Sequence, residues 1–268
     1  MIKEKIGIIG VGNMGGAILE GLFKKKIAHP GQVWVYDKIQ EKASSFSRQW
    51  KVHQTASSAE LVKQVRIIIL AVKPQDLDEA AAAFKISLQP FHLVISILAG
   101  TPIAKVSKAL GQRSAIVRAM PNLAAKVGEA VTALTGAKGH PLALAKEIFS
   151  GCGATLELQE RHFDLVTATS GSGPAYFFLL MELLAQVGEE NGLPKKAAQL
   201  LAVQTAVGAG LLAQSSPLSP AELRAMVTSK GGTTAAALKV LEDGKFSDIF
   251  CRAVEAARDR SRQLSQGG

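Results

Sequence analysis

Cysteine is scarce in this chain of 268 residues, which contains only Cys152 and Cys251. Two cysteines cannot build a disulfide framework, and their spacing matches no metal site. The chain also lacks an uninterrupted apolar stretch long enough to span a membrane, and Glu4 before the first apolar run argues against a signal peptide. We therefore expect a cytoplasmic protein without a metal ion and without membrane association.

Aromatic residues make up only 5% of the chain. The net charge is +9, from 31 lysines and arginines against 22 acidic residues, yet no basic stretch is interleaved with aromatics as in nucleic-acid-binding surfaces. We predict no nucleic-acid partner. The excess positive charge favours small anionic ligands in general, and most of these lysines are expected to be solvated surface residues.

A glycine-rich segment near the N-terminus, KIGIIGVGNMGG, is the feature around which the rest of the sequence is organised. The apolar run Ile6–Ile9 predicts a strand buried on both faces, and apolar residues at helical spacing follow the glycines. Gly10, Gly12 and Gly15 have the spacing G-x-G-x-x-G, which permits a tight turn, close approach of a pyrophosphate and close helix–strand packing. We predict a dinucleotide site here; a glycine-rich turn without a ligand is the alternative.

Strand and helix patterns alternate through the first part of the chain. Further strands are predicted over residues 32–37, 66–72, 93–98, 114–120, 131–134 and 154–158, with helices over 41–50, 58–64 and 142–150. Such alternation predicts a parallel, doubly wound sheet of Rossmann type. From about His162 onward only helical patterns follow. We predict a dinucleotide-binding domain over residues 1–160 and an all-helical domain over residues 161–268.

Charged residues stand at two predicted strand ends, on the edge of the sheet where ligands bind. Asp37 follows the glycine motif by about 20 residues, where an acidic residue holds the adenosine ribose and favours NAD. Lys38 and Lys42 are close enough to favour a 2′-phosphate, so the residues leave the choice between NAD and NADP open. Lys73 is well placed for the cofactor, although a turn before Pro74 explains it equally well.

One segment of the helical part, residues 193–212, is apolar on more than one face. A thin helical domain cannot bury such a helix by itself. We therefore predict that it pairs with a second subunit; a helix enclosed within one chain is the alternative.

Obvious catalytic residues are missing. None of the five histidines falls at a strand end near the glycine turn, and no Ser/His/Asp pattern occurs. The best remaining site is the stretch TSKGGTT in the helical part. Gly231 and Gly232 form a bend whose N–H groups can converge on a carboxylate, and Ser229, Thr233 and Thr234 supply hydroxyls. A plain helix cap formed by one of the threonines explains the stretch equally well.

Five motifs occur along the chain in this order: Gly10-Val11-Gly12-Asn13-Met14-Gly15, Ala71-Val72-Lys73-Pro74-Gln75, Arg118-Ala119-Met120-Pro121-Asn122, Gly171-Ser172-Gly173-Pro174-Ala175-Tyr176 and Thr228-Ser229-Lys230-Gly231-Gly232-Thr233-Thr234. They resemble, in the same order, the motifs of the pyrroline-5-carboxylate reductase family, and the resemblance covers essentially the whole chain. Many β-hydroxyacid dehydrogenase-like proteins share the first motif, whereas the last two together are specific. Lys230 is a departure, because members commonly carry proline there, and it bears on the stiffness of the loop.

The resemblance implies the last step of proline synthesis, the reduction of 1-pyrroline-5-carboxylate to L-proline with NAD(P)H, with NADPH first and NADH as the alternative. It implies a homodimer with intertwined helical domains, in which the partner subunit supplies the substrate loop, and in some members a ring of dimers. The cofactor-binding residues so expected are Ile9, Gly10, Val11, Gly12, Asn13, Met14, Ala71, Val72, Lys73 and Pro74, with Asp37 and Lys38 at the adenosine end. The substrate-binding residues are Ser229, Gly231, Gly232 and Thr233, and the catalytic residue is Thr234.

The chemistry of a cyclic imine suits a site with few catalytic residues. The imine is already electrophilic, especially when protonated, so hydride transfer needs positioning more than a strong acid. We expect Thr234 to orient or protonate the imine nitrogen, while the Gly231 and Gly232 amides hold the carboxylate.

Two other functions fit parts of the sequence. A β-hydroxyacid dehydrogenase or imine reductase of the same architecture would carry a catalytic lysine within a helix of the second domain, where Lys195 and Lys196 are the candidates. A non-catalytic dinucleotide-binding regulator would keep Gly10–Gly15 but would have no use for an anion site at Ser229–Thr234.

Overall fold

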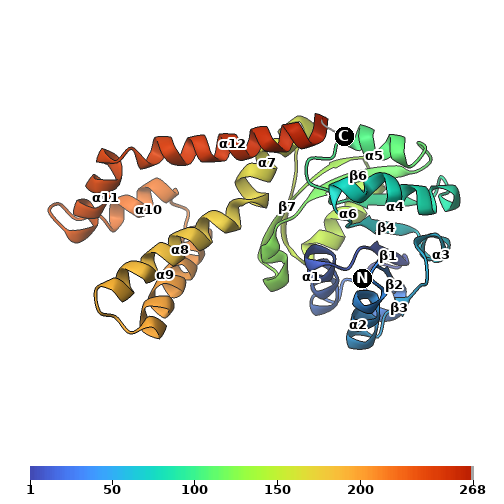
Figure 1. Ribbon diagram of the computed structural model, residues 1–268, viewed down its shortest axis with the longest axis horizontal. Coiled ribbons are helices and arrows are strands. Elements are labelled where there is room, and N and C mark those ends of the chain that lie inside the picture. The colour runs from blue at the N-terminus through green and yellow to red at the C-terminus, as the bar shows by residue number, and fades with distance from the viewer. Residues whose placement is uncertain (267–268) are drawn as a thin grey trace. The chain divides into compact units, whose positions relative to one another are not determined.

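The computed structural model describes residues 1–266, which divide into two compact units (Figure 1). The first unit consists of residues 1–172 together with the residues from Ala257 onward, and the second consists of residues 173–256. The predicted domain boundary after residue 160 stays a prediction. Residues 267–268 of the predicted second domain lie outside the described residues.

Eight strands within the described residues form one sheet, in the order β3-β2-β1-β4-β5-β6-β7-β8. They are β1 (Ile6–Ile9), β2 (Val33–Tyr36), β3 (His53–Gln54), β4 (Ile67–Leu70), β5 (Leu93–Ser96), β6 (Ala115–Met120), β7 (Ala130–Gly136) and β8 (Gly153–Glu157). β1 pairs in parallel with both β2 and β4, with Ile8 opposite Val35 and Ile69. Because the chain winds to one side of β1 and then to the other, a ligand crevice is expected at the carboxyl ends of these strands.

One strand pair departs from the parallel arrangement that the sequence predicted. β7 runs antiparallel to β6, and β8 is parallel to β7. The connection between β6 and β7, residues 121–129, contains only the short helix η4 (Leu123–Val127). A parallel crossover needs about a dozen residues or more, so this connection is too short to return the chain. The apolar pattern of a strand carries no information about its direction.

Helices cover both faces of the sheet. They are α1 (Asn13–Lys24), α2 (Gln40–Trp50), α3 (Ser58–Gln64), α4 (Leu77–Phe84), α5 (Ile103–Ala109) and α6 (His140–Ser150), with the one-turn helices η1 (Pro30–Gln32), η2 (Pro74–Asp76), η3 (Lys85–Ser87) and η5 (Glu160–His162). Successive residues of β1 point to opposite faces, so Ile8 packs with α1, α2 and α6, whereas Ile9 packs with α3, α4 and α5. Burial of each isoleucine side chain stabilises the fold by roughly 1.5–3 kcal/mol.

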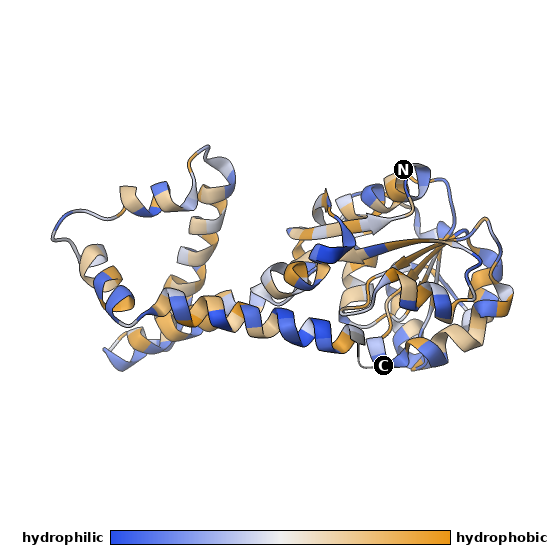
Figure 2. Cartoon of the chain, turned by 90° about the horizontal axis from the view of Figure 1, so that it is seen from above, coloured by the Kyte–Doolittle hydropathy of each residue, from blue (hydrophilic) through white to orange (hydrophobic). Residues whose placement is uncertain are grey.

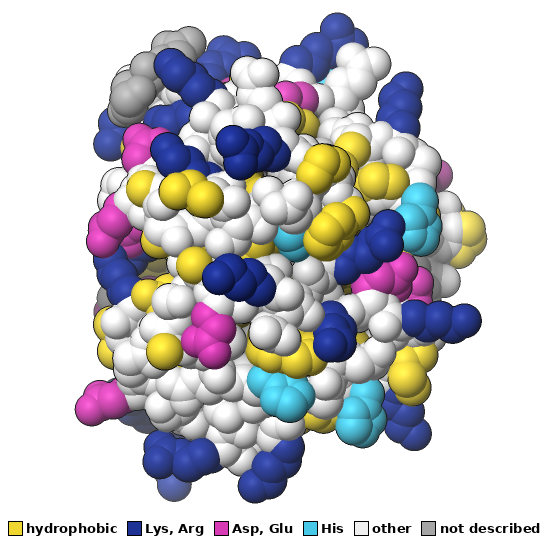
Figure 3. Space-filling view, turned by 90° about the vertical axis from the view of Figure 1, so that its right-hand side faces the viewer, with side chains coloured by type: hydrophobic (Ala, Val, Ile, Leu, Met, Phe, Trp, Pro, Cys, Tyr) yellow, Lys and Arg dark blue, Asp and Glu magenta, His cyan; other side chains and the backbone are white. Residues whose placement is uncertain are grey.

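The lysines and arginines of the face shown in Figure 3 are spread singly among other side chains. They do not gather into one stripe on this face. Such scattered charges are typical of a solvated surface.

After the sheet the chain is helical, as the sequence predicted. α7 (Phe163–Val166) and the π-helix η6 (Thr167–Gly171) close the first unit's continuous segment, and α8 (Gly173–Glu190), α9 (Lys195–Ser215), α10 (Pro220–Met226), α11 (Thr233–Asp243) and α12 (Phe246–Gln266) follow. The last turns of α12 belong to the first unit. Proline at the start of α10 and the Ser219 cap, which accepts a hydrogen bond from the Glu222 N–H, mark a helix start that the sequence signals directly.

The second unit leaves much of its apolar surface exposed. Its small buried cluster consists of Ala185, Ala198 and Ala202, where α8 and α9 pack against each other. In contrast, Phe177 is 62% and Leu200 is 66% exposed, and apolar residues are distributed along the helices of this unit (Figure 2). α9 is also the one described helix that is long and apolar enough to cross a membrane, judged by length and composition only.

Candidate functional site

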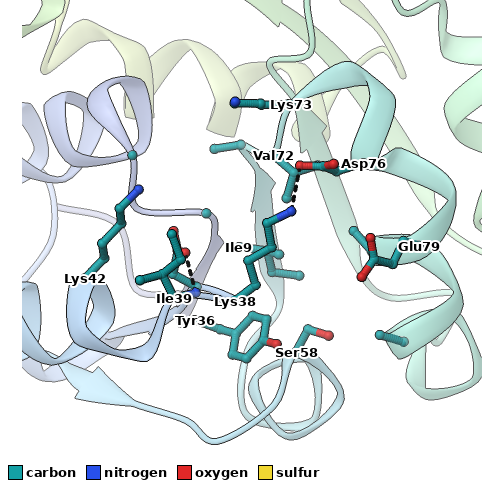
Figure 4. Close-up of a pocket in the computed structure, with 16 residues that line it drawn as sticks. Ile9, Tyr36, Lys38, Ile39, Lys42, Ser58, Val72, Lys73, Asp76 and Glu79 are labelled. Carbon is teal, nitrogen blue, oxygen red and sulfur yellow. Dashed lines mark hydrogen bonds and ion pairs between the residues drawn. The ribbon is translucent and has the colours of Figure 1, made fainter.

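A cavity of about 300 Å³ lies at the carboxyl ends of β1, β2 and β4 (Figure 4). Its lining residues are Ile9, Gly10, Gly12, Tyr36, Asp37, Lys38, Ile39, Lys42, Ser58, Ala71, Val72, Lys73, Asp76, Glu79, Ala80 and Ala83. This is the edge of the sheet at which the strand order reverses, where open α/β sheets bind their ligands.

The glycine turn between β1 and α1 forms one wall of this cavity. Gly10 has φ of +99°, a backbone conformation that other residues rarely adopt, and a side chain on Gly15 would collide with the Gly10 carbonyl oxygen. A Cβ on Gly12 would meet no atom within 4 Å. Gly10 and Gly15 are therefore required by the fold, whereas the missing side chain of Gly12 leaves open space beside the backbone.

The N-terminus of α1 is free to bind an anion. Its N-cap residue, Gly12, has no side chain to cap the helix, and no acidic residue occupies the first turn. The first N–H groups of a helix lack partners within the helix and carry partial positive charge. Together with the open space at Gly12, these groups fit the pyrophosphate of a dinucleotide.

Asp37, which follows β2, connects two loops of the cavity, the glycine turn after β1 and the loop after β2. Its Oδ2 accepts a hydrogen bond from the Val11 N–H at 2.9 Å, and its Oδ1 accepts one from the Ile39 N–H at 2.9 Å. The residue is only 8% exposed. The carboxylate therefore holds the glycine turn in place as well as facing the cavity.

Lys38 reaches across the cavity to the opposite wall. Its Nζ lies 3.2 Å from Oδ2 of Asp76, at the end of η2 (Figure 4). The hydrogen bond with Asp76 and the negative charge of Asp76 raise the pKa of Lys38. Lys42 and Lys73 also line the cavity, so three cations face it alongside the acidic groups.

The structure brings together most, but not all, of the cofactor residues predicted from sequence. Those that line the cavity are Ile9, Gly10, Gly12, Asp37, Lys38, Ala71, Val72 and Lys73, whereas Val11, Asn13, Met14 and Pro74 are not among its lining residues. Val11 is buried and contributes its N–H to Asp37, and Pro74 starts η2.

The sequence prediction missed the wall formed by α4. Asp76, Glu79, Ala80 and Ala83 line the cavity from η2 and α4, and Tyr36, Ile39 and Ser58 line it from the β2 side. α4 was not among the predicted helices. The lining residues of η2 and α4 follow Lys73 at intervals of three or four positions. This spacing is the sequence signal that would have placed them on one helical face.

A second candidate site lies within the helical unit, in the loop between α10 and α11. Gly231 has φ of +73°, and the Gly232 N–H donates to the Ser229 carbonyl oxygen at 3.0 Å. α11 starts at Thr233, and its N-cap is Gly232, which provides no side-chain cap. Neither threonine is the N-cap residue, so the first N–H groups of α11 have no side-chain cap from that position. Thr234 is half-buried and Ser229 is exposed.

Within the first unit, the end of one sequence motif contacts the residue that precedes another. Asn122, just after β6, donates from Nδ2 to Oγ of Ser170 at 3.2 Å and accepts from the Ala124 N–H at 3.1 Å. Ser170 belongs to the π-helix η6, and such helices are frequent at functional sites. The contact joins the end of β6 to the segment that leads into α8.

Arg118, from the same motif as Asn122, makes contacts that hold elements of the fold together. It is buried, pairs with Glu160 at 3.1 Å and stacks on Phe163 with its guanidinium carbon 4.8 Å from the ring centre. Burial lowers the pKa of Arg118, while the hydrogen bond and charge of Glu160 act in the opposite direction. Glu160 also accepts from the Ile103 N–H at 2.7 Å, so this pair ties α5, β6 and η5 together.

Comparison with known proteins gives two family matches. A family model described as pyrroline-5-carboxylate reductase dimerisation matches residues 160–264. A model described as NADP oxidoreductase, coenzyme F420-dependent, matches residues 5–100. The matches fall on the helical part and on the first half of the sheet, respectively.

Individual relatives are similar along their whole lengths. The pyrroline-5-carboxylate reductase of Methanosarcina acetivorans is 36% identical over 99% of this chain and 100% of its own, and that of Synechocystis is 39% identical over 98% of both chains. The solved structure of the reductase from Coxiella burnetii superposes with a TM-score of 0.91 at 35% identity, covering 98% of this chain and 99% of that one. The Plasmodium falciparum enzyme, solved with NADP bound, gives a TM-score of 0.90 at 30% identity over 99% of both chains.

Proposed function

The chain belongs to the pyrroline-5-carboxylate reductase family, and we propose that it reduces 1-pyrroline-5-carboxylate to L-proline with NAD(P)H. The observation that carries this proposal is the full-length similarity to reductases of that name, joined to a glycine turn that fits a dinucleotide. The alternatives are not favoured. Lys195 and Lys196, the candidates of the dehydrogenase or imine reductase alternative, are both exposed in the first turn of α9.

The cavity at β1, β2 and β4 is the cofactor site of this proposal. The N–H groups at the start of α1 and the open space at Gly12 receive the pyrophosphate, and Lys73 adds positive charge beside it. Asp37 and Lys38 stand at the adenosine end. When bound, the reduced nicotinamide supplies a hydride to the imine carbon, and the imine nitrogen ends as the protonated amine of proline.

The loop 229–234 is the substrate site of this proposal. The Gly231 and Gly232 amides and the uncapped start of α11 bind the carboxylate, and the Thr234 hydroxyl orients the ring nitrogen or donates a proton to it. Ser229 and Thr233 supply further hydroxyls. Because the imine is electrophilic on its own, the residues need to hold it in place rather than to activate it strongly.

The enzyme acts on a small molecule and forms an oligomer through its C-terminal helices, the part matched by the dimerisation family. We propose a homodimer whose partner covers the exposed apolar faces of α8 and α9 and completes the substrate site, with a ring of dimers as the larger assembly. Exposed side chains such as Leu200 and Leu211 support a protein partner. They also argue against a helix enclosed within one chain. In this proposal, α9, the helix of membrane-spanning length, lies in the dimer interface. The enzyme is proposed to be cytoplasmic.

An assay with purified protein tests the function. The protein is mixed with 1-pyrroline-5-carboxylate and either NADH or NADPH, and the loss of absorbance at 340 nm is followed together with the appearance of proline by amino-acid analysis. We expect both signals in equal amounts. A protein that oxidises neither cofactor with this imine, but reduces NAD⁺ or NADP⁺ with a β-hydroxy acid, would instead be a dehydrogenase of the same architecture. Light scattering after size exclusion tests the oligomer, and a monomer at assay concentration would refute the partner-completed site.

A further inference from the structure

The adenosine end of the cofactor cavity contains charges of both signs. The charged residues that line the cavity are Asp37, Lys38, Lys42, Lys73, Asp76 and Glu79. NADPH differs from NADH by a phosphate on the 2′-oxygen of the adenosine ribose, which adds about two negative charges near neutral pH. The choice between the cofactors therefore depends on which of these charges are free to meet that phosphate.

The Asp37 carboxylate is fixed. Both of its oxygens accept backbone N–H groups at 2.9 Å, from Val11 on one side and from Ile39 on the other. If the side chain swung away, the N–H of the buried Val11 would lose its partner, which is costly in a protein interior. A carboxylate has about four lone-pair sites, so Asp37 retains the capacity to accept a ribose hydroxyl.

The nearest cation is already paired. Lys38 Nζ lies 3.2 Å from Asp76 Oδ2, and the pair spans the cavity from the end of β2 to η2 (Figure 4). Glu79 lies on the same wall as Asp76 and adds to the negative charge there. A 2′-phosphate would have to draw Lys38 away from Asp76 and would still lie close to the immobile carboxylate of Asp37.

We propose that this enzyme prefers NADH to NADPH, because the fixed Asp37 carboxylate repels a 2′-phosphate and the Lys38–Asp76 pair withholds the nearest compensating cation. This preference rests on the proposed function, whose cofactor it specifies. Among the described residues, Lys42 and Lys73 form no ion pair. Lys73 is assigned to the pyrophosphate, which leaves Lys42 for a 2′-phosphate, and one lysine does not balance two phosphate charges beside a carboxylate.

Binding of the oxidised cofactors to the free enzyme tests the proposal without catalysis. Calorimetric titration of the purified chain with NAD⁺ and with NADP⁺ is expected to give a Kd for NAD⁺ that is lower by about tenfold or more. A Kd for NADP⁺ equal to or below that for NAD⁺ would overturn the proposal. Failure of the proposed function is a separate outcome. A protein that binds NAD⁺ selectively but does not reduce 1-pyrroline-5-carboxylate would support the cofactor preference and refute the proposed activity.

Two variants test the mechanism of the preference. Asp76→Asn frees Lys38 without touching the glycine turn, so the ratio of NADP⁺ to NAD⁺ affinity is expected to rise about threefold or more. Asp37→Asn removes the repelling charge and is expected to raise the ratio of NADP⁺ to NAD⁺ affinity, even if a looser turn weakens the binding of both cofactors.

The control is Glu157→Gln. It breaks the exposed ion pair between Glu157 and Lys146, whose charged atoms are 3.1 Å apart, and Glu157 does not line this cavity. If the ratio of NADP⁺ to NAD⁺ affinity is unchanged in both aspartate variants, the roles assigned to Asp37 and to the Lys38–Asp76 pair are refuted.

Discussion

Ser261 donates its hydroxyl to Oδ1 of Asp164 at 2.7 Å, although the two residues are 97 positions apart in the chain. Ser261 is 3% exposed, close to the end of α12, and Gly100 after β5 packs beside the same turn of that helix. A Cβ on Gly100 would come within 3.0 Å of Leu264 Cβ. The end of α12 is therefore part of the first unit and packs against the loop that follows β5.

This contact makes the last turns of α12 a source of stability. Ser261→Ala would leave the Asp164 carboxylate without this donor in a partly buried site, so we expect the free energy of unfolding to fall by about 1–2 kcal/mol. Ser265→Ala is the matched control, because the Ser265 hydroxyl bonds only to the Arg262 carbonyl of its own helix. Chemical denaturation of both variants measures the difference. Equal stability of the two would show that the Ser261 hydroxyl contributes nothing.

The glycines of the turn after β1 are expected to separate stability from binding. Gly12→Ala meets no atom in the structure, so we expect a folded protein that loses dinucleotide affinity at least about tenfold, since the methyl group occupies the space of the pyrophosphate. Gly15→Ala collides with the Gly10 carbonyl and is expected to lower the melting temperature by several degrees. Thermal melts with and without cofactor distinguish the two effects. A Gly12→Ala protein with normal affinity would contradict the assignment of this site.

Thr234 is expected to act on the substrate and not on the cofactor. Thr234→Ala removes the hydroxyl assigned to the ring nitrogen, so kcat/KM for 1-pyrroline-5-carboxylate should fall about tenfold to a hundredfold while cofactor Kd stays unchanged. Thr228→Ala is the control, because the Thr228 hydroxyl donates to the Arg224 carbonyl at 2.6 Å and has no assigned role in the reaction. Steady-state kinetics of both variants provide the measurement, and an unchanged kcat/KM would remove Thr234 from the mechanism.

His92 makes the stability of the first unit depend on pH. Its Nδ1 accepts from the Gln89 N–H at 2.8 Å, so the proton of the neutral ring is on Nε2, which faces the Val62 carbonyl at 3.2 Å. Burial lowers the pKa of His92 from 6.5. The unfolded chain then binds a proton that the folded chain does not, and the stability contributed by neutral His92 is present above about pH 6.5 and is lost as the pH falls below it.

Urea denaturation at pH 7 and at pH 5 measures this dependence. His92→Asn keeps an acceptor for the Gln89 N–H but cannot be protonated, so the variant is expected to be less stable at pH 7 and to lose less stability on acidification than the wild type. His53→Asn is a suitable control, because His53 is exposed. Parallel pH dependence in wild type and His92→Asn would contradict the role of this histidine.

Much of the architecture could be predicted because it depends on local patterns. Buried strands are short apolar runs, and a glycine motif between a strand and a helix has few other uses, so β1, α1 and the later strands other than β3 were predicted within a few residues of their observed bounds. The two-residue β3 and α4 were missed. β3 has too few residues to establish a period, and α4 is an alanine-rich segment whose apolar face is small.

The candidate sites were predicted less completely, because sequence neighbours show what can interact but not what does. Lys38 follows Asp37 directly, so these two residues left the cofactor preference open, and the family resemblance put NADPH first. In the structure the two side chains have different partners: Asp37 holds the turn at Val11, and Lys38 crosses to Asp76. The bend at Gly231 was predicted, but the position of Gly232 as the N-cap of α11 required the structure. The substrate-binding role of that loop stays a prediction.

By itself the sequence determined the fold class, the glycine turn after β1 and the family, since each follows from residue types at a fixed spacing along the chain. The tertiary structure alone decided the antiparallel pairing of β7, the return of α12 to the first unit and the partners of Asp37 and Lys38. These depend on contacts between residues far apart in the chain. Such contacts form only when burial and hydrogen bonding of the whole fold offset the entropy of bringing the segments together.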